Sequence, residues 1–214
     1  MDNPHKVITK PSAIGSRLHE LNVEADVLQE AIKYGVSYSS GCTAHDPPMM
    51  AGVSVWAKAT RFLRDQLVPK GWKLDNSRNY ATTVNVAQNY LIAVAAGDSM
   101  TGLPDNTPRT RTEKGPATRE AVSHNQSHFS DISTDFGPRP TALTKTWLLL
   151  HYLDEDQDEI RIELSQPAYM TDEGYVCDWL ERIILSPVPL TPVVDMGSSQ
   201  NQAIDVPVRQ RAAS

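Results

Sequence analysis

The chain lacks the features that mark several large classes of protein. Its two cysteines, Cys42 and Cys177, are too few for a disulfide scaffold and favour a reducing compartment. Its apolar runs, of which Leu91–Ala96 is typical, fall far short of the roughly 20 residues that span a bilayer. The opening residues, MDNPHKVITKP, contain no apolar core of a signal peptide. We therefore expect a soluble cytoplasmic protein with no membrane partner.

An excess of basic residues is also missing. Acidic residues outnumber Lys and Arg by 26 to 20, which gives a formal net charge of -6 at pH 7. This balance argues against a protein whose whole surface attracts nucleic acid, although it permits a local basic patch. The apolar share of 40% is ordinary for a globular protein, so the chain can form a packed core.

Two apolar stripes at helical spacing predict an N-terminal helical pair within residues 16–70. The first helix would span 16–35 and the second about 52–68. The first stripe consists of Leu18, Leu21, Ala25, Leu28 and Ile32, and the second of Val53, Trp56, Thr60, Leu63 and Leu67. Residues 37–50 are expected to be a loop, and residues 1–15, which have little periodicity, a flexible lead-in.

The apolar period then changes from 3.6 residues to 2, which predicts strands. The segments with this pattern are 82–87, 90–96, 146–153 and 159–165, while 175–186 is either a last strand or a short helix leading into one. Residues 71–186 would therefore hold a mostly antiparallel sheet of four or five strands. The helical pair would pack on this sheet to give one α+β domain over residues 16–186.

Two of these strands carry specific expectations about burial. Strand 146–153 is apolar on both faces, so we expect it to be central, with Trp147 and Leu149 in the core. In strand 159–165 the apolar residues alternate with Arg161 and Glu163, so this polar face is expected to contact water.

The remaining segments are mostly polar. A long polar stretch, 97–115, precedes a helix predicted over about 116–128, which would begin at a proline. From residue 187 to residue 214 the chain is rich in Pro, Gln, Ser and Ala and has no period, so we expect a disordered tail.

One string resembles a known catalytic motif. Residues 91–102, LIAVAAGDSMTG, place Gly97, Asp98 and Ser99 directly after a buried strand, and this string resembles the first block of the SGNH (GDSL-type) hydrolases. The resemblance implies that Ser99 is a nucleophile for an ester or acyl carbonyl, beside free backbone N–H groups. The later blocks, Gly-x-Asn-Asp and Asp-x-x-His, are not found, and the alternative interpretation is a turn that ends the strand.

Four residues have the chemistry of a zinc site. Cys42 and His45 have two residues between them, and His124 and His128 would lie one turn apart on the predicted helix. The two pairs could form a tetrahedral site, although about 80 residues separate them and more cysteines are usual in structural sites. A polar helix face is the simpler interpretation of the histidines, and we predict no metal or other cofactor.

Four basic residues, Arg109, Arg111, Lys114 and Arg119, form a basic segment over 109–119. Together with the N–H groups at the start of the helix that follows, they could bind a phosphate or a carboxylate, including that of a nucleic acid. The alternative is a solvated loop whose charges balance neighbouring glutamates.

No catalytic set is complete in the sequence. The leading hypothesis is therefore a non-enzymatic interaction module that binds another macromolecule, with a protein as the expected partner. Segment 97–115 and the tail over 187–214, which could become ordered on a partner, are the expected binding elements. The alternatives are a hydrolase with Ser99 as nucleophile, and a nucleic-acid or phosphate-binding protein that uses residues 109–119.

Overall fold

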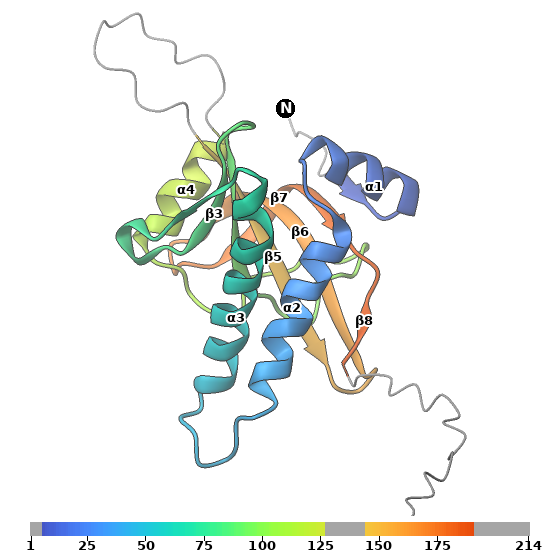
Figure 1. The fold of residues 1–214 in the computed structure, drawn as a ribbon, viewed down its shortest axis with the longest axis vertical. Coiled ribbons are helices and arrows are strands. Elements are labelled where there is room, and N and C mark those ends of the chain that lie inside the picture. The colour runs from blue at the N-terminus through green and yellow to red at the C-terminus, as the bar shows by residue number, and fades with distance from the viewer. Residues whose placement is uncertain (1–5, 127–143, 191–214) are drawn as a thin grey trace, which may run out of the picture.

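A computed structural model describes residues 6–126 and 144–190, which form an α+β fold (Figure 1). The predictions made for His128 and for residues 191–214 lie outside the described residues. Within the described ranges, the helices are too short or too polar to traverse a bilayer.

After a short strand, the described chain forms three helices where the sequence predicts two. α1 (Pro11–Glu20) and α2 (Ala25–Ser39) replace the single helix predicted over 16–35. α3 (Met50–Leu67) agrees with the helix predicted over 52–68. In Figure 1, α2 and α3 form an antiparallel hairpin whose loop extends below the strands. A short 3-10 helix, η1 (Val68–Lys70), follows α3 directly, and a second, η2 (Ser77–Asn79), comes later.

The first apolar stripe is interrupted at Asn22. This residue has a φ of 52°, a left-handed conformation that asparagine tolerates better than most residues. The N–H of Asn22 donates to His19 O at 2.9 Å, and the N–H of Val23 donates to Leu18 O at 3.1 Å. These two bonds form a Schellman motif, which ends α1 although the apolar spacing continues.

The sheet has eight strands, more than predicted. They are β1 (Lys6–Ile8), β2 (Lys73–Asp75), β3 (Thr82–Asn85), β4 (Tyr90–Ala96), β5 (Lys145–Asp154), β6 (Glu159–Met170), β7 (Val176–Ile184) and β8 (Val188–Pro189). The order is β1-β7-β6-β5-β4-β3-β2, with β8 paired to β6. The pairs β4/β5 and β1/β7 are parallel and the others are antiparallel.

The α+β class is therefore confirmed, but the predicted number of strands, four or five, is too low. The sheet is also mixed, although five of its seven pairs in the described residues are antiparallel. β1, β2 and β8 have only two or three residues each, too few to show a period of 2. The parallel β4/β5 pair requires a long crossover, and this crossover includes α4 (Pro116–Gln126).

Both predicted flexible ends contain ordered structure within the described residues. Residues 6–15, expected to be a flexible lead-in, form β1 and the start of α1, and β1 pairs with β7. Residues 187–190, expected to belong to the tail, include β8, which pairs with the start of β6. Both predictions are wrong for these residues because short pairing strands leave no periodic signal.

The main core lies between the sheet and the helical pair. α2 and α3 cover this face of the sheet, and their apolar stripes pack against the side chains of β4, β5 and β6 that point toward them. β5 is central, between β4 and β6, as predicted. Trp147 and Leu149 of β5 are buried in this core, which confirms their prediction as core residues.

The opposite face of the sheet is covered by α4 and by the polar stretch 97–115, which we call the closing segment. A smaller apolar cluster lies here, made of Ala93, Ala95, Val122, Leu148, Leu150, Met170, Val176 and Trp179. The N–H of Thr110 donates to Val176 O of β7 at 2.9 Å, and Thr110 also pairs with Gly97 after β4. β5 and β6 separate β4 from β7, so the closing segment links two strands that are not neighbours in the sheet.

Candidate functional site

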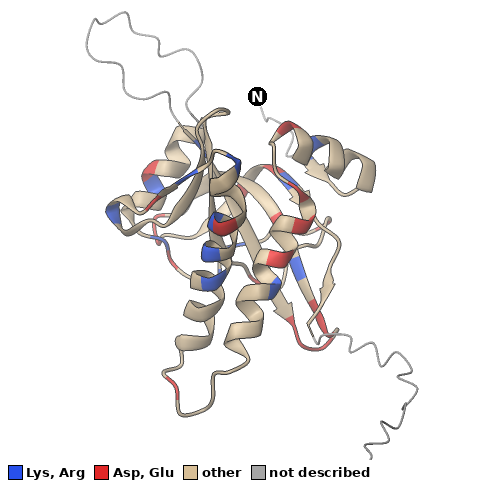
Figure 2. Ribbon diagram, viewed as in Figure 1, with Lys and Arg blue, Asp and Glu red and all other residues tan. Residues whose placement is uncertain are grey.

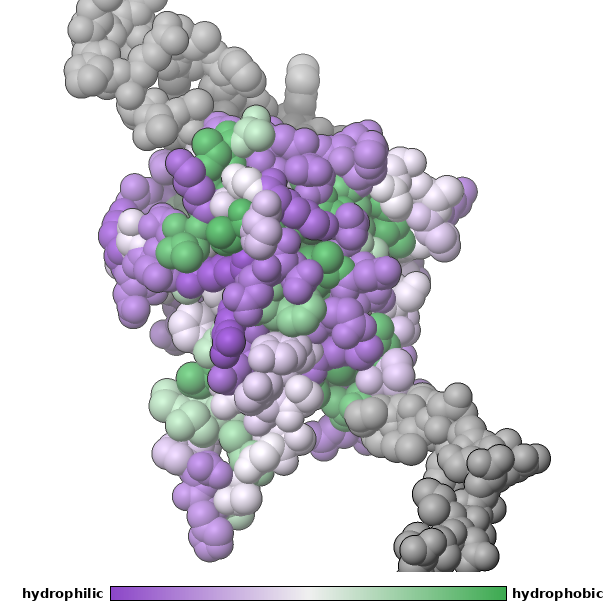
Figure 3. Space-filling view, in the orientation of Figure 1, coloured by the Kyte–Doolittle hydropathy of each residue, from purple (hydrophilic) through white to green (hydrophobic). Residues whose placement is uncertain are grey.

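Exposed apolar side chains concentrate at the end of the α2–α3 hairpin, over residues 37–57, which we call the hairpin tip. Large apolar residues that are exposed number eleven in the described chain, and five of them lie here. They are Tyr38, Met49, Met50, Val53 and Trp56. Met49 is 72% exposed and Trp56 is 41% exposed. In Figure 3, green and white residues lie on the lower part of the hairpin, above the purple residues at its end.

The hairpin tip also carries almost no charge. Asp46 is its only Asp, Glu, Lys or Arg residue, in a chain in which 21% of residues are charged. The Asp46 carboxylate accepts a hydrogen bond from the N–H of Thr43 at 2.8 Å, which closes the loop between the helices. Figure 2 shows the lower part of the hairpin largely free of charged residues. An apolar surface of this kind commonly marks a binding site.

The hairpin supports its tip through close helix packing. Gly35 of α2 lies so near α3 that a Cβ atom there would be 2.5 Å from Val55 O. The ring of Tyr34 packs against those of Tyr38 and Phe62, with centroid separations of 4.9 and 5.4 Å. The exposed residues are therefore presented by a packed pair of helices rather than by a long free loop.

The sequence predicts the helix that carries Val53 and Trp56 but not their exposure. Both residues belong to the second apolar stripe, which was expected to be buried along its length. Thr60, Leu63 and Leu67 of that stripe are buried, whereas Val53 and Trp56 lie in the first turns of α3, where the hairpin extends past the strands (Figure 1). Periodicity identifies the apolar face of a helix but not where its packing partner ends.

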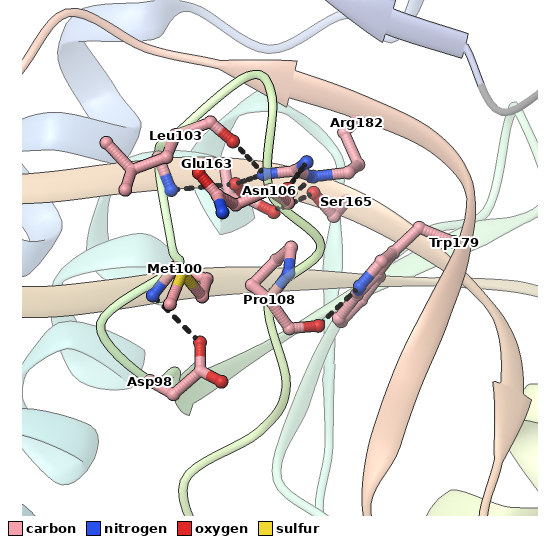
Figure 4. Close-up of polar contacts among 10 residues, drawn as sticks. Asp98, Met100, Leu103, Asn106, Pro108, Glu163, Ser165, Trp179 and Arg182 are labelled. Atoms are coloured by element: carbon pink, nitrogen blue, oxygen red, sulfur yellow. Dashed lines mark hydrogen bonds and ion pairs between the residues drawn. The ribbon is translucent and has the colours of Figure 1, made fainter.

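The closing segment, expected to be a binding loop, is held in place by a buried ion pair (Figure 4). Arg182 of β7 pairs with Glu163 of β6, with Nη2 2.6 Å from Oε2. The same guanidinium donates to the carbonyl oxygens of Asn106 at 2.6 Å and Leu103 at 3.2 Å. Glu163 in turn accepts a hydrogen bond from the N–H of Gly102 at 2.9 Å. Both charged groups thus bind the backbone of the closing segment.

Burial of this pair contradicts the expectation that the polar face of β6 contacts water. Glu163 is 0% exposed, and Arg161 and Arg182 are also buried. Ser165 Oγ donates to Glu163 Oε1 at 2.8 Å, and the indole N–H of Trp179 donates to Pro108 O at 2.8 Å. The prediction was wrong because the closing segment and the sheet enclose this face and supply its polar partners.

Ser99 lies in the turn that follows β4. Asp98 Oδ1 accepts a hydrogen bond from the N–H of Met100 at 3.1 Å, and Asp98 O accepts one from the N–H of Thr101 at 3.0 Å. The Ser99 side chain is exposed, and no described side chain exchanges a hydrogen bond with its hydroxyl. This geometry fits the interpretation of a turn that ends the strand.

His151 on β5 is the histidine nearest in the sheet to the end of β4, since it pairs with Ala96. It is buried, and burial, together with the charge of Lys114, lowers the pKa of its imidazole to about 4. Its Nδ1 atom has no hydrogen-bond partner among the described residues. The neutral ring is therefore a core residue, and it does not contact Ser99 as a base would.

The candidate zinc ligands are not brought together. Cys42 and His45 lie in the loop between α2 and α3, on the side of the main core, and Cys42 Sγ is 4.0 Å from Ser54 Oγ. His124 lies on α4, which covers the opposite face of the sheet. No cluster of three or more His, Cys, Asp or Glu suitable for a metal ion occurs in the described residues.

Two of the basic residues contact the turn between β6 and β7. The guanidinium of Arg109 lies 4.4 Å from the centre of the Tyr175 ring. Arg119 Nη2 donates to the carbonyl oxygens of Thr171 and Asp172 at 2.9 and 3.0 Å. These contacts fix the closing segment and α4 against the turn.

The other two basic residues are less engaged. Lys114 is half-buried, which lowers the pKa of its ammonium, and its Nζ donates to Thr112 Oγ1 at 2.9 Å. Arg111 is exposed. The basic segment is thus divided between structural contacts and two cations that an anion could still approach.

Comparison of the chain with protein-family models, with curated proteins and with solved structures found no match. The functional inference therefore depends on the exposed and buried side chains described above.

Proposed function

We propose that this protein is a non-enzymatic interaction module that binds another protein through the hairpin tip. The observation that supports the proposal is the cluster of Tyr38, Met49, Met50, Val53 and Trp56, exposed on an element with a single charged residue. Trp, Tyr and Met are enriched at the centres of protein interfaces, where charged residues are depleted. The flexible methionines would let the surface adapt to its partner.

The chemistry of the tip defines the expected partner. Apart from Asp46 and the bordering Lys58, whose Nζ lies 4.4 Å from the centre of the Tyr38 ring, the tip has no counter-charge for a partner, so the partner should present a mainly apolar groove or face. The cytoplasm is the proposed location, because Cys42 and Cys177 are both free thiols, as a reducing compartment would keep them.

Affinity capture from a lysate of the source cells tests the proposal with matched variants. The tip variant is Met49→Ser with Trp56→Ser. The control variant, Leu74→Ser with Val86→Ser, removes equally exposed apolar side chains on β2 and in the β3–β4 turn. We expect a protein that is retained by the parent and the control but lost by the tip variant, and that binds the purified parent directly.

Three outcomes would overturn the proposal. The captured protein could bind the tip variant as well as the parent, the control could lose it equally, or no protein could be retained specifically. Size-exclusion chromatography with light scattering tests whether the protein binds a second copy of itself. A dimer of the parent that the tip variant does not form would show that a second copy, rather than another protein, occupies the tip.

Binding of a nucleic acid or another phosphate is a second candidate, because Arg111 is exposed and Lys114 forms no ion pair among the described residues. The overall charge of -6 opposes general affinity for nucleic acids. An electrophoretic test of this candidate is described in the Discussion.

A further inference from the structure

A cleft of about 390 Å³ lies between α1 and the sheet, far along the fold from the hairpin tip. Its lining combines α1, the β3–β4 turn, β4, β5 and β6. The volume is at the lower end of the range of roughly 300–1,000 Å³ that is usual for small-molecule sites. Five different elements therefore build one concave surface, which the proposed protein-binding function does not use.

The cleft is preformed because α1 is fixed to the sheet on several sides. Arg17 of α1 donates to both carboxylate oxygens of Glu181 on β7, at 2.8 Å each. The hydroxyl of Tyr90 donates to Leu21 O at the end of α1. The side chain of Gln88 donates to Glu20 O at 2.8 Å. A ligand would thus meet a surface that is already in place, which favours binding.

Gln166 on β6 is the unexplained polar residue of the cleft. It is only 7% exposed, and it lies opposite Glu181 in the β6–β7 register. Its side-chain amide lines the cleft but forms no hydrogen bond with the described residues. This amide is absent from the buried polar atoms that lack a partner, so its remaining exposed surface faces the cleft, where a polar ligand can reach it.

The charges around the cleft favour an anion. Arg17 forms ion pairs with Glu20 and Glu181 at 2.7 and 2.8 Å, and Lys6 forms a second ion pair with Glu181 at 3.0 Å, so these two cations balance the two carboxylates. Lys145, two residues before Trp147 on the same face of β5, is exposed and forms no ion pair with the described residues. The cleft therefore keeps one uncompensated positive charge beside the free amide of Gln166.

We propose that this cleft binds a small carboxylate. Lys145 Nζ would form an ion pair with the carboxylate, and the side-chain Nε2–H of Gln166 would donate a hydrogen bond to one of its oxygens. Hydrogen bonds to a charged acceptor are stronger than those between neutral groups. The short apolar body of the ligand would lie beside the Arg17 guanidinium, which covers the nearly buried ring of Trp147 at 5.8 Å from its centre.

Titration of the ¹⁵N-labelled full chain with butyrate tests the proposal, with butyramide as the neutral probe of the same shape. We expect saturable shifts of the Trp147 indole N–H and the Gln166 amide with butyrate but not with butyramide. Lys145→Met and Gln166→Met should each weaken binding at least tenfold. The control Lys73→Met, which removes an exposed lysine from β2, should bind butyrate as the parent does.

Several results would overturn this inference. One is the absence of a saturable shift with butyrate up to roughly 50 mM, a concentration well above a millimolar dissociation constant. Another is equally strong binding of butyramide. Unchanged binding by Lys145→Met would have the same meaning. This exposed substitution keeps the test decisive even if Gln166→Met does not fold.

Discussion

The closing segment and the hairpin tip each contain residues whose exposure is the opposite of what the composition of the segment suggests. The closing segment is polar and rich in basic residues, yet Thr101 and Thr110 within it are fully buried. The hairpin tip contains methionine, valine and tryptophan, yet these side chains are exposed. The polarity of a segment thus does not show which of its residues are buried, because another part of the fold can supply their hydrogen bonds.

The difference has a physical origin in what each segment meets. The closing segment meets a buried carboxylate and guanidinium, so its backbone groups and those charges satisfy one another. The hairpin tip extends beyond the strands (Figure 1), and five of its large apolar side chains remain exposed. Apolar surface that remains exposed is available to a partner, and this is why the tip, rather than the polar stretch, is the stronger candidate interface.

The largest expected effect comes from breaking the buried pair. Arg182→Met leaves the Glu163 carboxylate buried without its counter-charge, which typically costs about 3–5 kcal/mol of the free energy of unfolding. Urea denaturation measures this loss. The control, Arg61→Met, removes a surface pair with Asp65 and should cost no more than about 1 kcal/mol. Equal stability of the two variants would show that the pair does not anchor the closing segment.

A somewhat smaller effect is expected where the two helices of the hairpin touch. Gly35→Ala places a methyl group against Val55 O, and overpacking of this kind costs about 1–3 kcal/mol. Gly52→Ala is the matched change in α3, where no atom lies within 4 Å, and it should be neutral or stabilising by up to about 1 kcal/mol. Thermal melts compare them. If both variants melt alike, the helices are not in close contact.

The pH dependence of stability tests the environment of His151. The folded state keeps the pKa of this imidazole near 4 because the ring is buried, while the unfolded chain binds a proton below about 6.5. The contribution of His151 to the free energy of unfolding is therefore complete above pH 6.5. It is lost as the pH falls toward 4, with a slope of at most about 1.4 kcal/mol per pH unit.

The measurement is the free energy of unfolding at pH 7 and pH 5. The parent should lose more stability between these two values than His151→Gln, whose side chain does not titrate. Equal losses would mean that His151 is accessible to water in the folded protein.

The smallest effect is expected from reversing the exposed charges of the closing segment. Arg109→Glu with Arg111→Glu removes the contact with Tyr175, worth about 0.5–1 kcal/mol at exposed sites. Electrophoretic shifts with short DNA and RNA at two salt concentrations should show no specific complex with the parent. A salt-sensitive complex that the double variant does not form would make nucleic-acid binding the better proposal.

The sequence predicts those parts of the fold whose packing partner is nearby in the chain. α3, β4 and the β5–β6 hairpin lie close to their predicted positions because each has a full apolar period. Burial of Glu163 was missed because its partners, Arg182 and the N–H of Gly102, come from distant segments. An alternating strand has the same pattern whether its polar face meets water or a covering segment.

The candidate interface was missed for a related reason. Val53 and Trp56 fit the apolar stripe of α3. The stripe does not show that this end of α3 lies past the end of the sheet. The run from residue 37 to residue 57, with Asp46 as its only charge, is the one signal that could have identified the hairpin tip from sequence.

Hydroxyl-radical footprinting of the protein, free and bound to its captured partner, tests the central claim most directly. In the free protein, Met49, Met50 and Trp56 should be oxidised rapidly, while the buried Trp179 beside the closing segment reacts slowly. The account predicts that the partner protects the three tip residues. Protection of Arg109 to Lys114 and Tyr175 instead, with the hairpin tip as reactive as before, would contradict it.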